Sequence, residues 1–534
     1  MNENFNQLLS KNARNIDKFI AYGTAGFRDK AIELQHIMFR MGILATLRAR
    51  VVKATIGVMI TASHNPEEDN GLKLIDPKGE MLDPSWESIC TYLANINDKE
   101  LLDSINKLIE DKSIDMSVVA HVLIGRDTRS SSERLHKAVI DGIQAGDGRV
   151  NDFGLVTTPQ VHYAVLCFNT NEEYGEPTEV GYYKKLSNAF IKLNGENGSQ
   201  IVANNYIPSV VIDGANGIGA IKIKQMKQFL GNSLNIEVIN DGNGVLNAFC
   251  GADFVKVQQR APKDLQLEVG KRYLAFDGDA DRIIYFYKNQ IDGYFHMLDG
   301  DKIAVLIASY LKDLLSSVQI SDIDLCIVQT AYANGSSTNY IENILKLPVH
   351  CVPTGVKHLH HRALQADIGV YFEANGHGTV TFSNKTVNRI KLCSHETSLK
   401  LLNFIDLVNQ TVGDAISDML VIESILRSKG QSIQDWDMLY TDLPNRNIKV
   451  TVKDRNVITT GDAERKVLTP IGLQDKIDAI VAKYGPNSRS FVRPSGTEDA
   501  VRIYAESTTQ DNTDSLAKEV AKVVYDMAYG VGGL

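Results

Sequence analysis

The sequence predicts an α/β protein built from several layered domains. Short apolar runs at 56–60, 122–125 and 273–276 are typical of buried strands, and each ends in a polar loop. Stretches with apolar residues at helical spacing alternate with these runs, which is the pattern of helices covering a sheet. At 534 residues the chain is too long for one core, so about three or four domains are expected.

Composition and charge exclude several classes of protein. Hydrophobic residues make up 43% of the chain and charged residues 23%, which is ordinary for a folded soluble protein. The 65 acidic and 56 basic residues give a net charge of −9, which argues against a surface for nucleic acid or an anionic membrane. The six cysteines show no CxxC spacing. Because neither a signal peptide nor an apolar run of roughly 20 residues is visible, we expect a cytoplasmic protein. It should bind no nucleic acid or membrane, and no obligate protein partner is evident.

The first region, placed at residues 1–190, contains a serine at the end of a predicted strand. A helix is expected from about residue 34 to 50, because its apolar residues recur at helical spacing. The strand at 56–60 follows and leads directly into Thr61 to Pro66, with polar turn residues behind it. Ser63 is therefore expected on a loop held by a rigid strand, where reactive side chains often lie. From this stretch alone, a serine that caps a helix or turn is the better interpretation.

A linker and a tight turn are predicted at the start of the second region. Residues 169–205 are polar, contain several glycines and show only one short amphipathic segment, which is typical of a linker. The strand at 210–212 then turns through Gly214, Gly217 and Gly219. This spacing is GxxGxG rather than GxGxxG, so it predicts a strand-to-helix turn and not a dinucleotide-binding loop.

Three aspartates follow the later strand of this region. Asp277, Asp279 and Asp281 alternate with small residues, so their carboxylates can converge on a hard divalent cation. An EF-hand loop begins in a similar way, but it needs glycine and glutamate where Arg282 and Lys288 stand. The residues that come next are typical of a strand and not of an exiting helix. The sequence therefore predicts a Mg²⁺ site with open positions for phosphate oxygens, with a solvated acidic turn as the alternative.

Two polar loops interrupt the strands and helices of the third region, which starts at about residue 301. The histidine-rich stretch Thr354 to His361 lacks a spaced fourth zinc ligand, so an exposed polar turn is expected there. The loop Glu373 to Gly378 lies between two predicted strands, at 369–372 and 379–382. Its carboxylate, amide and imidazole suit sugar hydroxyls, and a plain hairpin turn is the alternative.

The last region, from about residue 435, predicts a small α+β domain with a phosphate site. A strand, a helix, two paired strands and a C-terminal helix are expected in that order. Arg493 to Asp499, followed by Arg502, connects the paired strands at 490–492 and 501–505. Two arginines, two hydroxyls and a glycine amide that can be approached closely form a phosphate cradle. An ordinary hairpin turn would not need that many donors.

Four motifs thus lie in four separate regions: Thr61 to Pro66, Asp277 to Arg282, Glu373 to Gly378 and Arg493 to Asp499. Together, and in this order, they resemble the signature loops of the α-D-phosphohexomutase superfamily, and no motif position departs from that pattern. The resemblance covers nearly the whole chain. Three further stretches are most similar to the eukaryotic branch that acts on phosphorylated N-acetylglucosamine: Tyr22 to Arg28, Asp69 to Lys73 and Thr354 to His361.

The resemblance implies an α/β fold of four domains around a central cleft, of which three are mixed αβ layered domains and the fourth is a smaller C-terminal α+β domain. The implied domains are a phosphoserine domain at 1–190, a metal-binding domain at 191–300, a sugar-binding domain at 301–434 and a phosphate-binding domain at 435–534. The implied reaction interconverts the 6-phosphate and the 1-phosphate of N-acetylglucosamine, on the route to UDP-N-acetylglucosamine. The implied cofactors are Mg²⁺ and a hexose 1,6-bisphosphate as activator, and the implied partner is a phosphorylated amino sugar.

The resemblance also implies a role for each site residue. The catalytic group comprises a phosphoserine, a general base and three supporting residues, namely Ser63, Lys73, Arg28, His64 and His377. The metal group comprises Ser63, Asp277, Asp279 and Asp281. The sugar is contacted by Glu373, Ala374, Asn375 and Gly376, and the phosphate that does not react is held by Arg493, Pro494, Ser495, Gly496, Thr497 and Arg502. Near Mg²⁺ and arginines, Lys73 is expected to lose its proton more easily. Arg28 and His377 are secondary candidates for the proton transfer. His64 is expected only to support the serine, because neighbours on an extended chain point to opposite sides.

Two other functions stay open at this point. A phosphatase could use the same carboxylates to hydrolyse a phosphosugar, and it would need no bisphosphate. A catalytically silent sugar-phosphate binding protein is disfavoured, because Ser63 and the three aspartates are intact. If the protein is a mutase, Glu373, Asn375 and the turn from Thr354 to His358 are expected to recognise the acetamide at carbon 2, since the phosphate contacts are the same for every hexose phosphate.

Overall fold

The computed structural model describes residues 4–23, 26–194, 205–318, 320, 322–496 and 498–533. The chain divides into two compact units. Unit 1 comprises Met1–Asp299, Asn375–Thr379 and Cys393–Gln434. Unit 2 comprises Gly300–Ala374, Val380–Leu392 and Asp435–Leu534. Among the described residues, no helix is both long enough and apolar enough to cross a membrane.

The first sheet of unit 1 leads into the serine loop. Its middle strand, β2 (Ile56–Ile60), is buried along its whole length, as expected of an apolar run covered on both faces. β2 pairs antiparallel with β3 (Asp69–Ile75) and parallel with β4 (Ala120–Arg126). The polar residues that follow Ser63 do not all lie in a turn, because Asp69, Asn70 and Gly71 belong to β3 and pair with β1. The order is β1-β3-β2-β4-β5, and the edge strands are β1 (Phe27–Lys30) and β5 (Gly148–Leu155).

Two helices of this domain cross each other closely at a glycine. α2 (Gln35–Val52) matches the predicted helix and is buried on nearly all sides, which is typical of a core helix. It packs against α5 (Ser132–Ala145), where a Cβ added at Gly142 would lie 1.9 Å from the carbonyl oxygen of Phe39. The other helices of this part are α1 (Phe5–Lys11), α3 (Pro84–Asn95), α4 (Asp98–Asp111) and α6 (Thr158–Asn169).

The second sheet of unit 1 carries the three aspartates on a hairpin. β8 (Tyr273–Phe276) and β9 (Ile283–Lys288) pair antiparallel, so Asp277 to Arg282 forms the connection between them. A strand follows the aspartates, as the sequence predicted. This excludes an EF-hand, because an EF-hand loop is followed by a helix. The order of the sheet is β10-β9-β8-β6-β7. The other elements of this layer are β6 (Ser209–Asp213), α8 (Ile218–Leu230), β7 (Asn235–Ile239), α9 (Gly251–Gln258) and β10 (Phe295–Leu298).

The predicted linker at 169–205 is wrong for much of its length. Glu179–Asn194 forms helix α7, whose Tyr182 and Phe190 are buried. Apolar side chains on one face of this segment pack against neighbouring helices, so its polar residues mark the outer face of a packed helix and not a free connection. Residues 195–204 lie outside the described part of the chain. The helices that α7 contacts include α14 (Glu396–Leu407) and α15 (Ala415–Lys429).

The first layer of unit 2 is a four-stranded sheet with the order β12 (Val349–Val352), β11 (Leu325–Thr330), β13 (Ile368–Phe372) and β14 (Gly378–Phe382). β11 pairs parallel with β12 and β13, as the alternation of strands and helices predicted. Thr354 to His361 is not the expected exposed turn, because helix α12 (Val356–Ala363) begins there. His360 is buried in it, with Nδ1 2.9 Å from the hydroxyl of Tyr371. Besides α12, the helices of this part include α10 (Gly300–Val318), α11 (Gly335–Asn339), α13 (Asn384–Leu392) and α16 (Ile433–Asp437).

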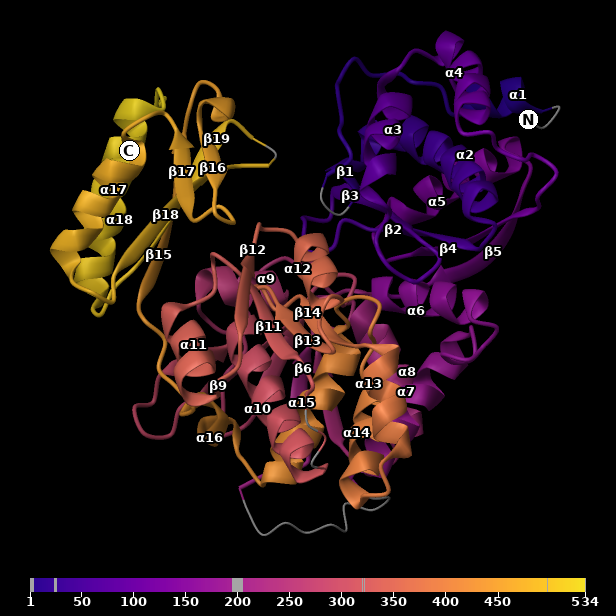
Figure 1. Cartoon of the computed structure of the whole chain (residues 1–534). Coiled ribbons are helices and arrows are strands. Elements are labelled where there is room, and N and C mark those ends of the chain that lie inside the picture. The colour runs from indigo at the N-terminus through magenta and orange to yellow at the C-terminus, as the bar shows by residue number, and fades with distance from the viewer. Residues whose placement is uncertain are drawn as a thin grey trace. The chain divides into compact units, whose positions relative to one another are not determined.

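The C-terminal layer of unit 2 is the predicted small α+β domain. Its sheet has the order β15 (Asn445–Thr451), β19 (Ala500–Glu506) and β18 (Arg489–Pro494). Two helices, α17 (Leu473–Val481) and α18 (Gln510–Met527), pack beside this sheet (Figure 1). Their apolar residues, including Ile477 and Val520, share a core with the strands. A separate ribbon is formed by β16 (Thr459–Gly461) and β17 (Lys466–Thr469).

We predict that Gly142→Ala destabilises the protein, because the new methyl group would overlap the carbonyl oxygen of Phe39 and push α2 and α5 apart. Overpacking of this kind costs about 1 to 3 kcal/mol and occasionally more. Urea denaturation followed by circular dichroism measures the loss. Gln144→Ala, at an exposed position of the same helix, is the control. Equal denaturation midpoints for the two variants would contradict the close approach.

Candidate active site

Ser63 is buried at the end of β2 in a conformation that few residues other than glycine adopt. Its φ of +52° lies in the left-handed region, and such backbone strain is often found at functional sites. Its N–H donates a hydrogen bond to Thr61 Oγ1 at 2.9 Å. Its hydroxyl donates to Asp277 at 2.7 Å and lies 3.4 Å from a carboxylate oxygen of Asp281. The fold thus brings the predicted nucleophile to the predicted metal ligands.

The carboxylates of Asp277, Asp279 and Asp281 converge, as the sequence predicted. All three are buried, and one oxygen of each lies within 4.8 Å of the others. One oxygen of Asp279 accepts hydrogen bonds from Thr158 at 2.6 Å and from Lys73 at 2.8 Å. Its other oxygen is buried and accepts none from the described residues. Hard oxygen ligands with one buried oxygen still to be satisfied fit Mg²⁺.

Burial and mutual repulsion shift the pKa values of the three carboxylates apart. Burial, together with the charges of Asp281 and Asp279, raises the pKa of Asp277 well above its ordinary value. Burial is also the largest influence on the other two and acts to raise their pKa, but their polar contacts together outweigh it. These contacts are with Lys73 and Thr158 for Asp279, and with Lys73, His377 and Arg282 for Asp281. The pKa of Asp279 is therefore lowered, and that of Asp281, which His377 also contacts, is lowered further. A divalent cation would favour the charged form of all three.

Lys73 lies among the same carboxylates. Its ammonium donates hydrogen bonds to Asp279 and Asp281, both at 2.8 Å. Burial lowers the pKa of Lys73, but the two carboxylates raise it by more, so the pKa lies above its ordinary value. The protein groups by themselves therefore do not produce the easier deprotonation that was expected. A cation bound to the same carboxylates would be needed to offset their charge.

Arg28 and His64 lie beside the serine loop. Nη1 of Arg28 is 3.4 Å from Nε2 of His64. The other ring nitrogen of His64 is 3.3 Å from Asp253, which also lies 3.8 Å from Arg282. The charge of Arg282 and burial lower the pKa of His64. The imidazole is therefore favoured in its neutral form and is oriented by a carboxylate, in keeping with the supporting position predicted for it.

His377 contacts the metal-binding loop within unit 1. Its Nδ1 lies 2.6 Å from the carbonyl oxygen of Asp281. Gly376 precedes it with φ +86°, and a Cβ there would lie 2.0 Å from the carbonyl oxygen of Ile283. Only glycine fits such a position without strain. Asn375 accepts a hydrogen bond from the N–H of His377 at 3.0 Å, so the turn itself is ordered by its own side chain.

The first two residues of the predicted sugar loop, Glu373 and Ala374, belong to unit 2. Glu373 accepts a hydrogen bond from the N–H of Gly355 at 3.3 Å. Gly355 lies directly before α12, in the stretch that was expected to recognise the substituent at carbon 2. The two loops assigned to the sugar therefore contact each other.

The predicted phosphate cradle contains a row of cations. Arg493 on β18 lies directly opposite Arg502 on β19, which in turn lies directly opposite Lys449 on β15. Side chains at directly opposite positions leave the same face of a sheet. Like charges in this arrangement are unfavourable, whereas an anion bound between them would be stabilised. Glu498 offsets part of the charge, at 3.2 Å from Lys449 and 3.5 Å from Arg502.

The turn of the cradle is formed by the residues after β18. Pro494 ends the strand, and the N–H of Ser495 donates to the carbonyl oxygen of Ala500 at 2.8 Å, which closes the turn. A Cβ added at Gly496 would meet no atom of the described residues within 4 Å, so they leave the backbone there open to a ligand. Thr497 lies outside the described residues.

Residues that the sequence analysis did not single out hold the serine loop in place. Arg129 is buried, and its guanidinium donates at 2.5 to 2.9 Å to the backbone carbonyl oxygens of Ser63, Asn65, Pro66 and Asp69. Its Nε donates to Asp127 at 3.1 Å. Asn247 donates to two of the same carbonyl oxygens, at 2.9 and 3.0 Å. The only sequence signal for Arg129 was that charged residues follow the predicted strand at 122–125. No sequence pattern pointed to Asn247, Thr158 or Lys449.

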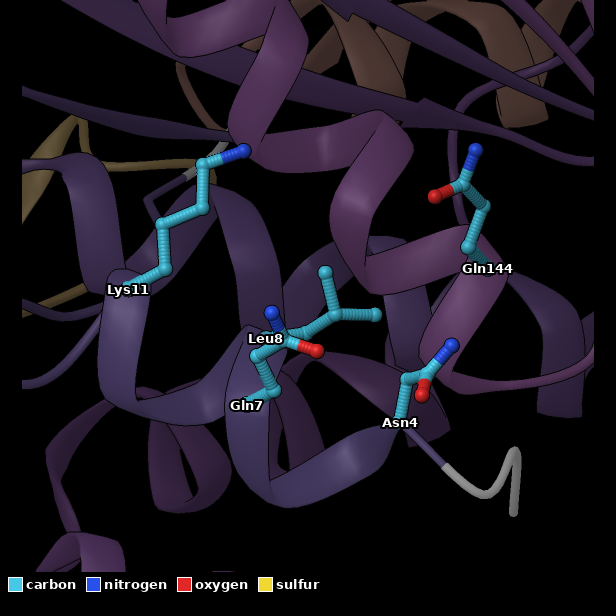
Figure 2. A pocket seen from close by; sticks show the side chains of 5 residues that line it. All are labelled: Asn4, Gln7, Leu8, Lys11 and Gln144. Atoms are coloured by element: carbon cyan, nitrogen blue, oxygen red, sulfur yellow. The ribbon is translucent and has the colours of Figure 1, made fainter.

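A pocket elsewhere in unit 1 takes no part in this site. Figure 2 shows it beside α1 and α5, lined by Asn4, Gln7, Leu8, Lys11 and Gln144. None of the predicted site residues lines it. The one charged group in its lining, Lys11, is paired with Asp141 at 2.8 Å. The pocket therefore lacks the carboxylates, hydroxyls and arginines on which the predicted chemistry depends.

Comparison with known proteins defines the class. Family models described as phosphoglucomutase/phosphomannomutase match residues 23–100 and 104–173 as alpha/beta/alpha domain I, and residues 447–523 as the C-terminal domain. Between them, models described as phosphoacetylglucosamine mutase AMG1 match 175–284 as domain II and 299–431 as domain III. Four such domains, with a serine loop and an aspartate cluster, define a hexose-phosphate mutase of the α-D-phosphohexomutase superfamily.

Individual relatives narrow the class. The phosphoacetylglucosamine mutase of Sus scrofa is 54% identical over 521 residues, which cover 96% of this chain and 95% of its own length. A solved N-acetylglucosamine-phosphate mutase in its substrate complex has a TM-score of 0.93 and 46% identity, covering 98% of this chain and 99% of that one. The Aspergillus fumigatus N-acetylphosphoglucosamine mutase with GlcNAc-6P and magnesium has a TM-score of 0.93 and 45% identity, covering 99% and 100%. The chain therefore belongs to the phosphoacetylglucosamine mutase family, which confirms the resemblance inferred from its motifs.

We predict that Arg129→Lys lowers kcat by at least about tenfold, because one ammonium group cannot donate to four carbonyl oxygens and small displacements of a reacting group are costly. Arg50→Lys is the matched control. Arg50 is also buried and donates to three backbone carbonyl oxygens, but these lie at Val118, Gly146 and Asp147. Both variants should lose stability, measured as melting temperature, and only Arg129→Lys should lose turnover per folded molecule. Equal turnover in the two would show that Arg129 has no positioning role.

Proposed function

We propose that this protein interconverts N-acetylglucosamine 6-phosphate and N-acetylglucosamine 1-phosphate through a phosphoserine at Ser63 and a 1,6-bisphosphate. The observation that carries the proposal is the 2.7 Å hydrogen bond that joins Ser63 to the cluster of three buried carboxylates. Two relatives support this substrate. One is the phosphoacetylglucosamine mutase of Sus scrofa, at 54% identity, and the other is the solved Aspergillus fumigatus enzyme with GlcNAc-6P. The product would enter the route to UDP-N-acetylglucosamine.

The proposed chemistry is a phosphoryl transfer that runs in both directions. The bond between Ser63 Oγ and phosphorus breaks while a bond from phosphorus to the free sugar hydroxyl forms. The hydroxyl proton passes to a base, and Ser63 Oγ is left to accept the other phosphate of the bisphosphate. Asp277, Asp279, Asp281 and the phosphorylated serine would hold Mg²⁺, which when bound neutralises charge on the phosphoryl oxygens.

Three residues are proposed to serve the proton transfer, and a fourth is proposed to support the serine loop. Lys73 is the proposed base. It contacts Asp279 and Asp281, and a cation bound to these carboxylates would offset the charge that raises its pKa. Arg28 and His377 are secondary candidates, and His64 supports the loop. A base in this position must lie within hydrogen-bonding reach of the sugar hydroxyl in the complex.

The remaining site residues are proposed to bind the substrate. Glu373, Ala374, Asn375 and Gly376 would contact the sugar, and Arg493, Pro494, Ser495, Gly496, Thr497 and Arg502 would hold the phosphate that does not react. The row of like charges formed by Arg493, Arg502 and Lys449 supports this assignment, because such a row favours a bound anion. The division into domains at 1–190, 191–300, 301–434 and 435–534 is part of the same proposal, with one role for each domain.

We predict that Ser63→Ala abolishes turnover and leaves the fold intact, because the hydroxyl is the only proposed phosphoryl acceptor and its loss removes one hydrogen bond, worth about 1 kcal/mol. A coupled assay with N-acetylglucosamine 6-phosphate, with and without added glucose 1,6-bisphosphate, measures turnover. Intact-mass analysis should find one phosphate on the wild type and none on the variant. Wild-type turnover in Ser63→Ala would refute the covalent mechanism, and release of inorganic phosphate instead of sugar 1-phosphate would identify a phosphatase.

We also predict that chelation abolishes activity and that Mg²⁺ restores it. Asp279→Asn should raise the Mg²⁺ concentration for half-maximal activity by at least about tenfold, because it removes the charge of one hard ligand. Calorimetric titration with Mg²⁺ measures the same loss without turnover. Asp462→Asn, an exposed site in unit 2, is the control for a change of net charge. Full turnover in excess chelator would remove the metal from the mechanism.

A further inference from the structure

The side chain of Glu464 joins two loops of unit 2 that were assigned separate roles. Glu464 lies on the turn between β16 and β17. Its Oε2 accepts hydrogen bonds from the N–H of Thr354 at 2.9 Å and from the Thr354 hydroxyl at 2.5 Å. Its Oε1 accepts a hydrogen bond from Nη1 of Arg493 at 3.1 Å. One carboxylate therefore bridges the arginine proposed for the phosphate and the loop proposed for the sugar.

The backbone of this turn is strained at three successive residues. Asp462, Ala463 and Glu464 have φ values of +51°, +53° and +67°, so three successive residues with a Cβ lie in the left-handed region. Each such residue costs energy, and the arrangement persists only where its surroundings determine it. The Glu464 side chain is 18% exposed, whereas that of Asp462 is 47% exposed and pairs with the neighbouring Arg465.

Two of the three guanidinium nitrogens of Arg493 donate hydrogen bonds to other side chains. Nε donates to the hydroxyl of Tyr332 at 3.2 Å, Nη1 donates to Glu464, and the guanidinium lies 5.6 Å from the centre of the Tyr332 ring. A guanidinium has five N–H donors in a fixed plane, so contacts at Nε and Nη1 orient the group and leave the donors of Nη2 for a phosphate. Glu464 and Tyr332 therefore orient Arg493 without occupying Nη2.

The chain of contacts continues to the sugar loop. Gly355, the residue after Thr354, donates its N–H to Glu373 at 3.3 Å. Adjacent residues of one backbone move together, so a displacement of Thr354 also displaces the donor that Glu373 accepts from. The contacts run without a gap from Arg493 through Glu464 and Thr354 to Glu373.

We propose that Glu464 is a positioning residue that couples the capture of the phosphate to recognition of the sugar at carbon 2. It orients Arg493 with one oxygen and fixes the Thr354 turn with the other. This inference rests on the proposed function and deepens it, since it makes affinity and substrate preference depend on one carboxylate outside the four motifs.

The test compares Glu464→Ala and Glu464→Gln with the wild type, using N-acetylglucosamine 6-phosphate and glucose 6-phosphate as substrates and glucose 1,6-bisphosphate as activator. Glu464→Ala should raise KM for the first substrate by at least about tenfold, because charge-assisted hydrogen bonds to both loops are lost. It should also shrink the ratio of the two kcat/KM values by at least about threefold, with a smaller change in kcat. Glu464→Gln can still accept on one side only, so its values should lie between those of the wild type and Glu464→Ala.

Two controls separate positioning from general stability. Asp462→Asn lies in the same turn, carries an exposed side chain and should leave KM and the substrate ratio unchanged. Thr354→Ala should shrink the ratio, and adding it to Glu464→Ala should cause no further loss, because the two act through one contact. Melting temperatures identify any variant that does not fold, and if Glu464→Ala fails to fold, Glu464→Gln decides.

Each outcome decides the question. A raised KM with an unchanged ratio would overturn the coupling, because Glu464 would then serve the phosphate alone. A lowered KM would overturn positioning and identify Glu464 as a competitor of the phosphate for Arg493. Unchanged kinetics in folded Glu464→Ala would overturn the inference but leave the proposed function standing. A wild type inactive on N-acetylglucosamine 6-phosphate in the presence of the bisphosphate would overturn both.

Discussion

Three carboxylates buried within 4.8 Å of one another cannot all remain charged unless positive groups surround them, and the catalytic part of unit 1 is built to meet that constraint. Lys73 lies 2.8 Å from two of them, and Arg282 lies 3.8 to 3.9 Å from two. These cations do not suffice for Asp277, whose pKa stays well above its ordinary value. A divalent cation bound there would supply the missing charge, which supports the Mg²⁺ site proposed for this cluster.

The serine side of the same site depends on hydrogen bonds from other segments of unit 1. Ser63 has a left-handed backbone, and the carbonyl oxygens of its loop accept hydrogen bonds from side chains. Arg129 and Asn247 donate to those oxygens from two other segments of unit 1. Thr158 contacts Asp279 from a third, through its hydroxyl at 2.6 Å and its N–H at 3.3 Å. The reacting groups are thus aligned by the packing of several elements and not by the loop alone, which suits a step that requires exact placement of the nucleophile.

Local sequence patterns predicted the parts of the site that one segment specifies by itself. The strand before Ser63, the alternating aspartates and the paired strands around Arg493 are each encoded within a few residues. Arg129 and Asn247 could not be predicted in this way, because their partners are 60 to 184 residues away. The exposed turn expected at Thr354 to His361 was wrong for a related reason.

The stretch from Thr354 to His361 is rich in histidine and has a polar sequence. Its Val356 and Leu359 are nevertheless buried, and His360 on α12 contacts Tyr371 on β13. A polar residue is compatible with burial when a partner from another element satisfies it, and the partner does not appear in the local pattern. Polarity therefore predicts exposure only where the fold offers no such partner. The prediction of a linker at 169–205 was wrong for the same reason. Tyr182 lies on a helix whose sequence is polar, yet it is buried and donates a hydrogen bond to Asp414 at 2.8 Å.

The two units carry like-charge clusters of opposite sign. In unit 1, three carboxylates are crowded together and only partly neutralised, while in unit 2 Lys449, Arg502 and Arg493 stand in a row across three strands. In each cluster, neighbouring groups of the opposite charge neutralise part of the net charge and leave the rest uncompensated. The uncompensated charge is unfavourable in the protein alone and would become favourable with a ligand of the opposite sign. This supports the proposed divalent cation in one unit and the proposed phosphate in the other. Binding of either ligand should consequently stabilise the unit that holds it.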